Sequence, residues 1–275
     1  MTPIVQDTSP AALTAAIEDN LFAFFALFRR LPGAAYEDRP DRIRLVTGIP
    51  FPMFNAVFRA RLAPATLEAE ITATLAPFTA RHLPMLWWTG PATQPADLGA
   101  RLQARGMVRT SDSTGMACDL RDLPPPVMPP GLTIHRVSDA SGFAAWVEPV
   151  GRSFDLPPFA ANALRGFCER LGFGPDTPLQ HYVGRMDGTP VAGASLCLGA
   201  GVAGLYNVAT IPEGRDQGTA TALVLAALHA ARTRGYRVGI LQSSRMGLNL
   251  YRRLGFAEYC TIAHYLGPPV PDPGR

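Results

Sequence analysis

The sequence predicts an α/β fold, and residues 205–256 carry most of this prediction. An apolar strand over 205–210 runs into a glycine-bearing turn over 215–220, and a helix follows at once. A second strand over 237–242 leads to a short helix that ends at Phe256. Strands that alternate with helices in this way predict a sheet with helices packed on its faces.

The turn before the first of these helices has the chemistry of an anion site. The helix itself is marked by apolar residues on its buried side, namely Ala222, Leu223, Ala226, Ala227 and Ala230. Free backbone N–H groups and the positive end of the helix dipole converge at such a helix start. The turn therefore predicts a place where a pyrophosphate can bind.

Two other phosphate motifs are excluded by spacing and composition. A Rossmann fingerprint needs G-x-G-x-x-G, and Gly214 and Gly218 are wrongly spaced for it. A Walker loop needs a lysine, and the chain contains none, so all its basic side chains are arginine.

Three motifs in this stretch resemble the acyl-CoA-binding core of the GNAT superfamily of N-acetyltransferases. The turn Arg215-x-x-Gly218-x-Ala220 resembles the phosphate loop of that family. The strand end Val208-Ala209-Thr210 resembles the strand that holds the acyl carbonyl and the pantetheine arm. The segment Leu250-Tyr251-x-x-Leu254-Gly255-Phe256 resembles the helix that bears the family's tyrosine acid. The chain departs from the family where Ala220 replaces a second glycine, and where Ser244 stands in place of an asparagine seven residues before the tyrosine.

The resemblance implies a mixed central sheet flanked by helices, and acetyl-CoA as the co-substrate. It implies that the Val208 N–H polarises the acyl carbonyl and that Tyr251 donates to the leaving sulfur. The cofactor-binding residues that it implies are Val208, Ala209, Thr210, Arg215, Asp216, Gln217, Gly218, Thr219, Ala220 and Ser244. No carboxylate lies between Leu205 and Ile211, so Asn207 is the candidate to hold a catalytic water there. Glu148 and Asp155 are alternative bases, and each is better explained as a surface charge.

The remaining elements of the second half follow in order. A strand is expected over 132–137, then helices over 138–154, broken or kinked at Pro149, and over 158–171. Strands over 180–186 and 190–198 flank Asp187-Gly188, which is a strong hairpin signal. A last strand over 258–266 closes the sheet.

A proline-rich stretch over 121–131 predicts an extended linker between residues 1–120 and a GNAT-like domain over 132–267. The first half resembles a degenerate copy of the second, since Leu98–Met107 resembles the helix ending in Leu254-Gly255-Phe256. In this alignment Leu62, Ala65 and Leu102 take the places of Arg215, Gly218 and Tyr251. The sequence thus predicts two tandem GNAT-like modules, of which only the second has a functional site. An unrelated α/β cap is the alternative for the first half.

Composition narrows the function classes. The net charge of +3 is small, and without a dense basic run nucleic acid is an unsuitable partner. The four cysteines and five histidines lack metal-ligand spacing, so neither a metal site nor a disulfide is expected. The apolar run 21–28 is too short to span a bilayer and predicts a core helix buried on two sides, with an aromatic site wall as the alternative. With no secretory signal, the expected location is the cytoplasm.

The sequence therefore predicts an acyltransferase that moves an acetyl group from acetyl-CoA to an amine by direct attack in a ternary complex. The acceptor is a small molecule or a peptide, and the protein is a monomer or a homodimer. The alternatives are a CoA-binding sensor without turnover and an interaction protein that keeps only the fold.

Overall fold

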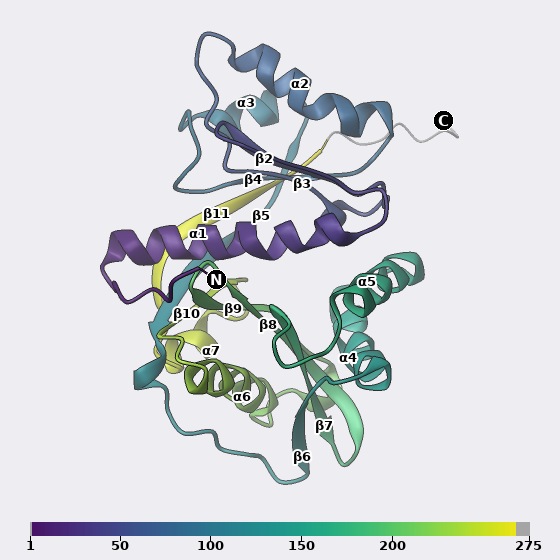
Figure 1. Ribbon diagram of the computed structural model, residues 1–275, viewed down its shortest axis with the longest axis vertical. Helices are drawn as coiled ribbons and strands as arrows, with labels where there is room; N and C mark the ends of the chain where they lie inside the picture. The colour runs from purple at the N-terminus through teal and green to yellow at the C-terminus, as the bar shows by residue number, and fades with distance from the viewer. Residues whose placement is uncertain (1, 268–275) are drawn as a thin grey trace. The chain divides into compact units, whose positions relative to one another are not determined.

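The computed structural model describes residues 2–267, which form two compact units (Figure 1). Unit 1 contains the chain up to Phe24 together with Gly115–Tyr259, and unit 2 contains Phe25–Thr114 together with the chain from Cys260. Each unit is thus built from two separate stretches of sequence.

These units differ from the boundaries expected from the linker, because hydrogen bonding within the sheet decides them rather than chain order. Strand β5 (Val108–Asp119) passes from unit 2 into unit 1, where it lies next to β10 (Val238–Ser243). Strand β11 (Ala257–Leu266) passes the other way and pairs antiparallel with β4 (Leu86–Thr89). The closing strand of each half therefore completes a sheet begun by the other half.

Unit 1 has a mixed sheet in the order β5-β10-β9-β8-β7-β6. Its further strands are β6 (Leu132–Arg136), β7 (Leu179–Met186), β8 (Thr189–Gly199) and β9 (Val202–Thr210). Neighbours pair antiparallel from β6 to β9, whereas β9 and β10 are parallel. The predicted mixed α/β sheet is confirmed.

Helices cover both faces of this sheet (Figure 1). They are α4 (Ala140–Ser153), α5 (Pro158–Leu171), α6 (Thr219–Thr233) and α7 (Leu248–Arg253), with short 3₁₀ turns at Leu120–Asp122 and Pro212–Gly214. The Asp139 carboxylate caps α4 by accepting from the Gly142 N–H at 2.7 Å. The helix runs on through Pro149, where the sequence predicted a break or kink.

The β7–β8 hairpin turns at Asp187-Gly188, as the sequence predicted. Both residues have positive φ, 49° and 85°, which a two-residue turn of type I′ requires. Met186 pairs with Thr189 across the turn, and the register of the hairpin shifts once further along, between Arg185 and Gly184.

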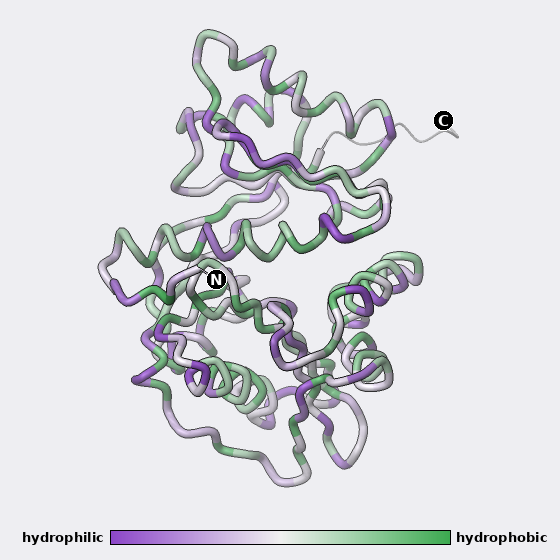
Figure 2. The backbone as a smooth tube through the Cα atoms, in the orientation of Figure 1, coloured by the Kyte–Doolittle hydropathy of each residue, from purple (hydrophilic) through white to green (hydrophobic). Residues whose placement is uncertain are grey.

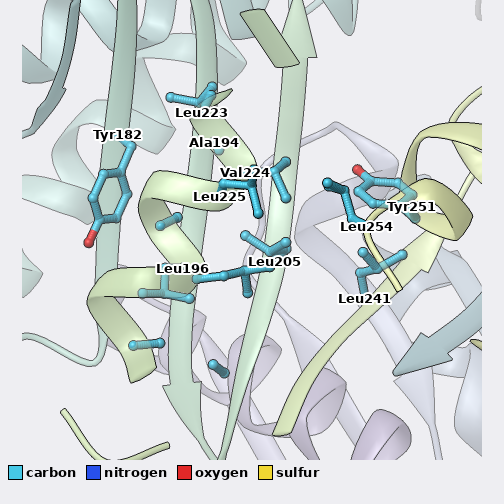
Figure 3. Close-up of a cluster of buried hydrophobic side chains, with 14 of the residues drawn as sticks. Tyr182, Ala194, Leu196, Leu205, Leu223, Val224, Leu225, Leu241, Tyr251 and Leu254 are labelled. Atoms are coloured by element: carbon cyan, nitrogen blue, oxygen red, sulfur yellow. The ribbon is translucent and has the colours of Figure 1, made fainter. Parts of the chain in front are cut away.

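The core of unit 1 lies between α6 and the central strands. Figure 2 shows apolar residues along α6, and Figure 3 shows Leu223, Val224 and Leu225 of that helix in one cluster with Ala194, Leu196 and Leu205 of the sheet. Burial of each such side chain stabilises the fold by about 1.5–3 kcal/mol. Residues 192, 194 and 196 of β8 belong to this cluster, while the residues between them face α4, as strand alternation requires.

Unit 2 repeats part of this arrangement in the order β1-β2-β3-β4-β11-β5. Its elements are β1 (Ala35–Arg39), β2 (Arg42–Val46), β3 (Asn55–Phe58), α2 (Leu67–Ala80) and α3 (Leu98–Ala104), with 3₁₀ turns at Leu27–Arg30 and Pro52–Phe54. Strands β3 and β4 pair parallel with α2 between them in the chain, as β9 and β10 do with α6.

Helix α1 (Pro10–Ala26) contains most of the aromatic run. Leu21, Phe22, Phe24, Phe25 and Phe28 are all at most 9% exposed, which confirms the expected burial of more than one helix side. By length and composition alone Pro10–Arg30 could cross a membrane, and 56% of that window is buried within the structure.

Removal of residues 1–131 is expected to give an aggregating product. Unit 1 would lose Asn20, whose side-chain amide donates to the Gly199 carbonyl at 2.8 Å, and Cys118 and Leu120, which lie against Gly239. The apolar surface left behind favours association. Size-exclusion chromatography with light scattering measures this, and co-expression of residues 1–131 as a separate chain should restore solubility. A soluble, fully active fragment would contradict the expectation.

Candidate functional site

The turn before α6 has the backbone geometry of an anion-binding loop. Asp216 and Gly218 have positive φ, 59° and 78°, and Gly218 is the residue that precedes the helix. The N–H groups of Thr219, Ala220 and Thr221 begin the helix, so they have no helical carbonyl four residues earlier. The turn is exposed from Arg215 to Gly218, whereas Thr219 is buried and Ala220 and Thr221 are half-buried.

Arg215 and Gln217 brace this turn from within. The Arg215 Nε donates to the Thr210 carbonyl at 3.0 Å, which ties the turn to the end of β9. The Gln217 amide donates to the Glu213 carbonyl at 3.1 Å. The rest of the Arg215 guanidinium remains available to add positive charge beside the turn.

Two hydroxyl groups at the ends of this segment are buried without a partner. The Oγ1 atoms of Thr210, at the end of β9, and Thr219, at the start of α6, have no hydrogen-bond partner among residues 2–267. A buried polar atom without a partner costs free energy, so such atoms often mark a ligand site. Both residues were predicted to bind the cofactor.

Strands β9 and β10 separate at the point where the site lies. Their parallel pairing runs from Ala203↔Gly239 to Leu205↔Leu241, yet β9 continues to Thr210. The residues of β9 change from buried to half-buried at Tyr206, directly after the last pair. Among the described residues, the end of β9 after Leu205 therefore has no strand partner on the side of β10.

A β-bulge lies on the other side of the same strand segment. Ser195 pairs with Tyr206 and Gly193 with Ala209, so Asn207 and Val208 together oppose the single residue Ala194. Asn207 has φ +52°, and asparagine tolerates this left-handed conformation better than most residues. Its Nδ2 donates to Ser195 Oγ at 3.2 Å, and this hydrogen bond fixes the orientation of the Asn207 side-chain amide.

Tyr251 lies at the edge of the unit 1 core, beside Leu254 and Leu241 (Figure 3). It is 8% exposed, and its ring meets Phe256 edge-on at a centroid distance of 5.8 Å. Burial raises the pKa of its hydroxyl to about 12. The phenol is therefore a firmly protonated donor at neutral pH.

Ser244, Glu148 and Asp155 are more exposed than Tyr251. Ser244 follows the end of β10, and its carbonyl accepts from Ser243 Oγ and from the Gly247 N–H. Glu148 is about half exposed and lies 4.0 Å from Arg152, and Asp155 is exposed on the segment between α4 and α5. Among residues 2–267 no group of three or more metal-ligating side chains comes together.

Sequence reasoning missed a buried polar chain behind the bulge. His181 is one of the five histidines that lack metal-ligand spacing, and its Nδ1 lies 2.9 Å from Ser195 Oγ while its Nε2 lies 3.3 Å from Cys168 Sγ. Burial lowers the pKa of His181 to about 3. Only the alternation of His181 and Ser195 with apolar neighbours on predicted strands could have indicated that both face one layer.

The depressed pKa of His181 predicts a pH-dependent stability. The unfolded imidazole, with a pKa near 6.5, binds a proton that the folded one rejects, so stability present above pH 6.5 is lost as the pH falls toward 3. Between pH 7 and 4 this amounts to about 3 kcal/mol. The free energy of unfolding, measured with urea at pH 7 and at pH 4, should fall between these pH values by about 3 kcal/mol less in His181→Gln than in the wild type. Equal losses in both proteins would contradict the assigned burial of the imidazole.

Unit 2 has apolar residues at the positions that correspond to the charged and phenolic side chains of this site. Leu62 and Leu102, which align with Arg215 and Tyr251, are 4% and 0% exposed in the apolar core of that unit. Ala65, aligned with Gly218, is exposed ahead of α2.

Comparisons with known proteins bear on the family and the fold. Residues 151–256 match the Acetyltransferase (GNAT) family. No curated protein matches the sequence. The fold is similar to that of a GCN5-related N-acetyltransferase from Kribbella flavida, with 20% identity over 96% of this chain and 97% of that one and a TM-score of 0.69.

Two further solved structures match over both units. A GCN5-related N-acetyltransferase from Sphaerobacter thermophilus has 19% identity over 98% of each chain and a TM-score of 0.63. A tandem GNAT protein from the clavulanic acid biosynthesis pathway has 15% identity over 98% of each chain and a TM-score of 0.61. The likeness extends through the first half, so the predicted tandem fold is confirmed.

Proposed function

We propose that unit 1 transfers an acetyl group from acetyl-CoA to an amine, on the basis of the match of residues 151–256 to the GNAT acetyltransferase family and of the tandem GNAT fold. One observation supports this most strongly. The anion turn, the end of β9 beyond its pairing with β10 and the Tyr251 helix all adjoin strands β9 and β10 of a single unit. These are the three groups that a phosphate-bearing thioester needs.

Each group has a separate task in the proposed binding of acetyl-CoA. The N–H groups from Asp216 to Ala220 hold the pyrophosphate, while the Arg215 N–H donates to the Pro212 carbonyl and the Arg215 guanidinium adds charge. The pantetheine arm lies along the end of β9, where Ala209 and Thr210 supply backbone groups and the Thr210 hydroxyl gains a partner. Ser244 borders the same segment from the end of β10.

The chemical step is nucleophilic attack by a neutral amine on the thioester carbonyl. The carbon–nitrogen bond forms as the carbonyl oxygen becomes an oxyanion, which the Val208 N–H stabilises. The carbon–sulfur bond then breaks, and the thiolate leaves with a hydrogen bond from Tyr251. The amine's proton passes to a water that the Oδ1 of Asn207 holds. Glu148 is a less suitable base, because it is exposed and paired with Arg152.

The pKa values decide what Tyr251 does in this step. A thiol has a pKa near 8.5, and the Tyr251 pKa is about 12. Complete proton transfer to the thiolate is therefore uphill by about 5 kcal/mol. Tyr251 acts as a hydrogen-bond donor whose interaction strengthens as charge develops on sulfur.

Two measurements test the proposed function. Isothermal titration with acetyl-CoA measures binding, and thiol release over a panel of small amines, amino acids, aminoglycosides and peptide N-termini measures turnover. The chain has no lysine, so acetylation of its own lysine side chains does not contribute. Binding without release on any amine would favour a CoA sensor, and absence of binding would favour an interaction protein.

A further inference from the structure

The β-bulge at Asn207 and Val208 is held from two directions by side chains outside β9. A bulge removes one residue from the strand ladder and re-aims the backbone groups beside it. The position of the Val208 N–H thus depends on whatever fixes the bulge. The contacts on its β8 side identify the residues that do so.

The first contact comes from α4. Trp146 Nε1 donates to the carbonyl of Ala194 at 3.0 Å, and Ala194 is the single residue that faces the two-residue bulge. The indole reaches it because the neighbouring residue is Gly193. A Cβ there would lie 3.1 Å from both Cδ1 and Nε1 of Trp146.

The second contact is the polar chain that begins at Asn207. Ser195 Oγ accepts from the Asn207 amide, so its single hydrogen is left for His181 Nδ1. His181 then carries its own proton on Nε2, facing Cys168 Sγ. Ser195, Cys168 and His181 are 0%, 1% and 4% exposed, so water does not compete for these bonds.

The imidazole in this chain is fixed in place and uncharged. Its ring packs against Trp146 at a centroid distance of 4.5 Å and edge-on against Phe143 at 5.1 Å. The low pKa that burial gives His181 keeps it neutral at any working pH. Because an asparagine amide carries no proton onward, the chain is suited to fix geometry rather than to move protons.

We propose that Trp146, His181 and Ser195 form a clamp that sets the bulge and so aims the Val208 N–H at the thioester carbonyl. His181 and Ser195 are positioning residues that act through Asn207, and Trp146 acts through Ala194. The inference rests on the proposed function, because the direction of this N–H affects rate only where an acyl carbonyl binds beside it.

The first test is Ser195→Ala, which removes the central hydroxyl with little change in volume. Loss of one oxyanion donor lowers kcat by about 10²–10³. A misaimed donor should cost less, about 10- to 100-fold, while KM for acetyl-CoA changes by less than about twofold because the phosphate contacts are elsewhere. Cys118→Ala, a buried truncation on β5, is the control and should keep kcat. An unchanged kcat, or a loss confined to KM, would overturn the clamp.

A double-mutant cycle separates the clamp from a direct role of Asn207. Asn207→Gly keeps the positive φ and removes the side-chain tie. Asn207→Gly also removes the proposed water ligand, so it should be the less active of the two single variants. If Ser195 acts through the tie, the double variant Ser195→Ala/Asn207→Gly loses no more kcat than Asn207→Gly alone. Losses that multiply would mean that Asn207 and Ser195 act independently, and the proposal would fail.

The clamp can also be tested without catalysis, so that its failure is distinguishable from failure of the proposed function. In ¹⁵N-labelled protein, the Val208 amide should shift and exchange faster in Ser195→Ala, and wild-type His181 should be the Nε2–H tautomer. An unmoved Val208 amide or the Nδ1–H tautomer overturns the clamp. Wild-type protein that releases no thiol on any amine overturns the proposed function, and with it the effect on rate, whatever the amide shows.

Discussion

Replacement of Tyr251 by phenylalanine is expected to lower kcat by about 10² to 10⁴, with acetyl-CoA affinity nearly unchanged. The ring stays in the core beside Leu254, so packing is preserved and only the donor to the leaving sulfur is lost. The phosphate contacts proposed above lie in the turn before α6 and do not involve the phenol. Steady-state kinetics with isothermal titration measures both quantities.

Tyr182→Phe is the matched control for this variant. Tyr182 belongs to the same apolar cluster, is 5% exposed and donates its hydroxyl to Gln180 Oε1. Its loss should leave kcat within about twofold, since a neutral hydrogen bond is worth about 1 kcal/mol of stability and touches no reacting atom. Comparable losses in both variants would mean that Tyr251 acts through packing.

Two readouts then separate a leaving-group role from other roles of the phenol. The loss in Tyr251→Phe should shrink with an acyl donor whose thiol is more acidic, because a better leaving group needs less help. The wild-type kcat should not fall between pH 9 and 10.5 through this group, since its raised pKa keeps the donor protonated there. Equal losses for both donors would remove the leaving-group role.

Gly218→Asp is expected to abolish acetyl-CoA binding. The new carboxylate would lie at the helix start, where the pyrophosphate is proposed to bind. Repulsion between unit charges about 4 Å apart is roughly 4 kcal/mol near a protein surface, which corresponds to about a thousandfold in Kd. Isothermal titration measures the loss.

The backbone strain of this substitution needs its own control, because Gly218 has φ +78°. Gly188→Asp introduces the same side chain at φ +85° in the β7–β8 hairpin, with open space around its Cβ. It should lose stability without losing affinity. Gly218→Asn repeats the strain at the site without the charge and should bind more tightly than Gly218→Asp. Unchanged affinity in a folded Gly218→Asp protein would refute the turn as the phosphate site.

Local sequence patterns were sufficient for the elements that depend on local physics. The Asp187-Gly188 hairpin follows from the positive φ that its turn needs, and the α6 core from the spacing of its apolar residues. The turn from Arg215 to Gly218 was predictable because a glycine ahead of a helix fixes where free N–H groups lie. The substitutions at Leu62 and Leu102 likewise indicated that the first half lacks the anion turn and the phenol.

Long-range pairing decided the rest. The exchange of β5 and β11 depends on hydrogen bonds between residues far apart in sequence, and no local pattern encodes which sheet a closing strand joins. The bulge depends on the register of β8 against β9, and the chain from Cys168 through His181 and Ser195 to Asn207 exists only once that register is set. The sequence by itself determined the fold class and the residues that form the proposed acyl-CoA site. Tertiary structure alone decided which side chains stand behind that site, because buried polar groups find their partners through packing rather than through sequence proximity.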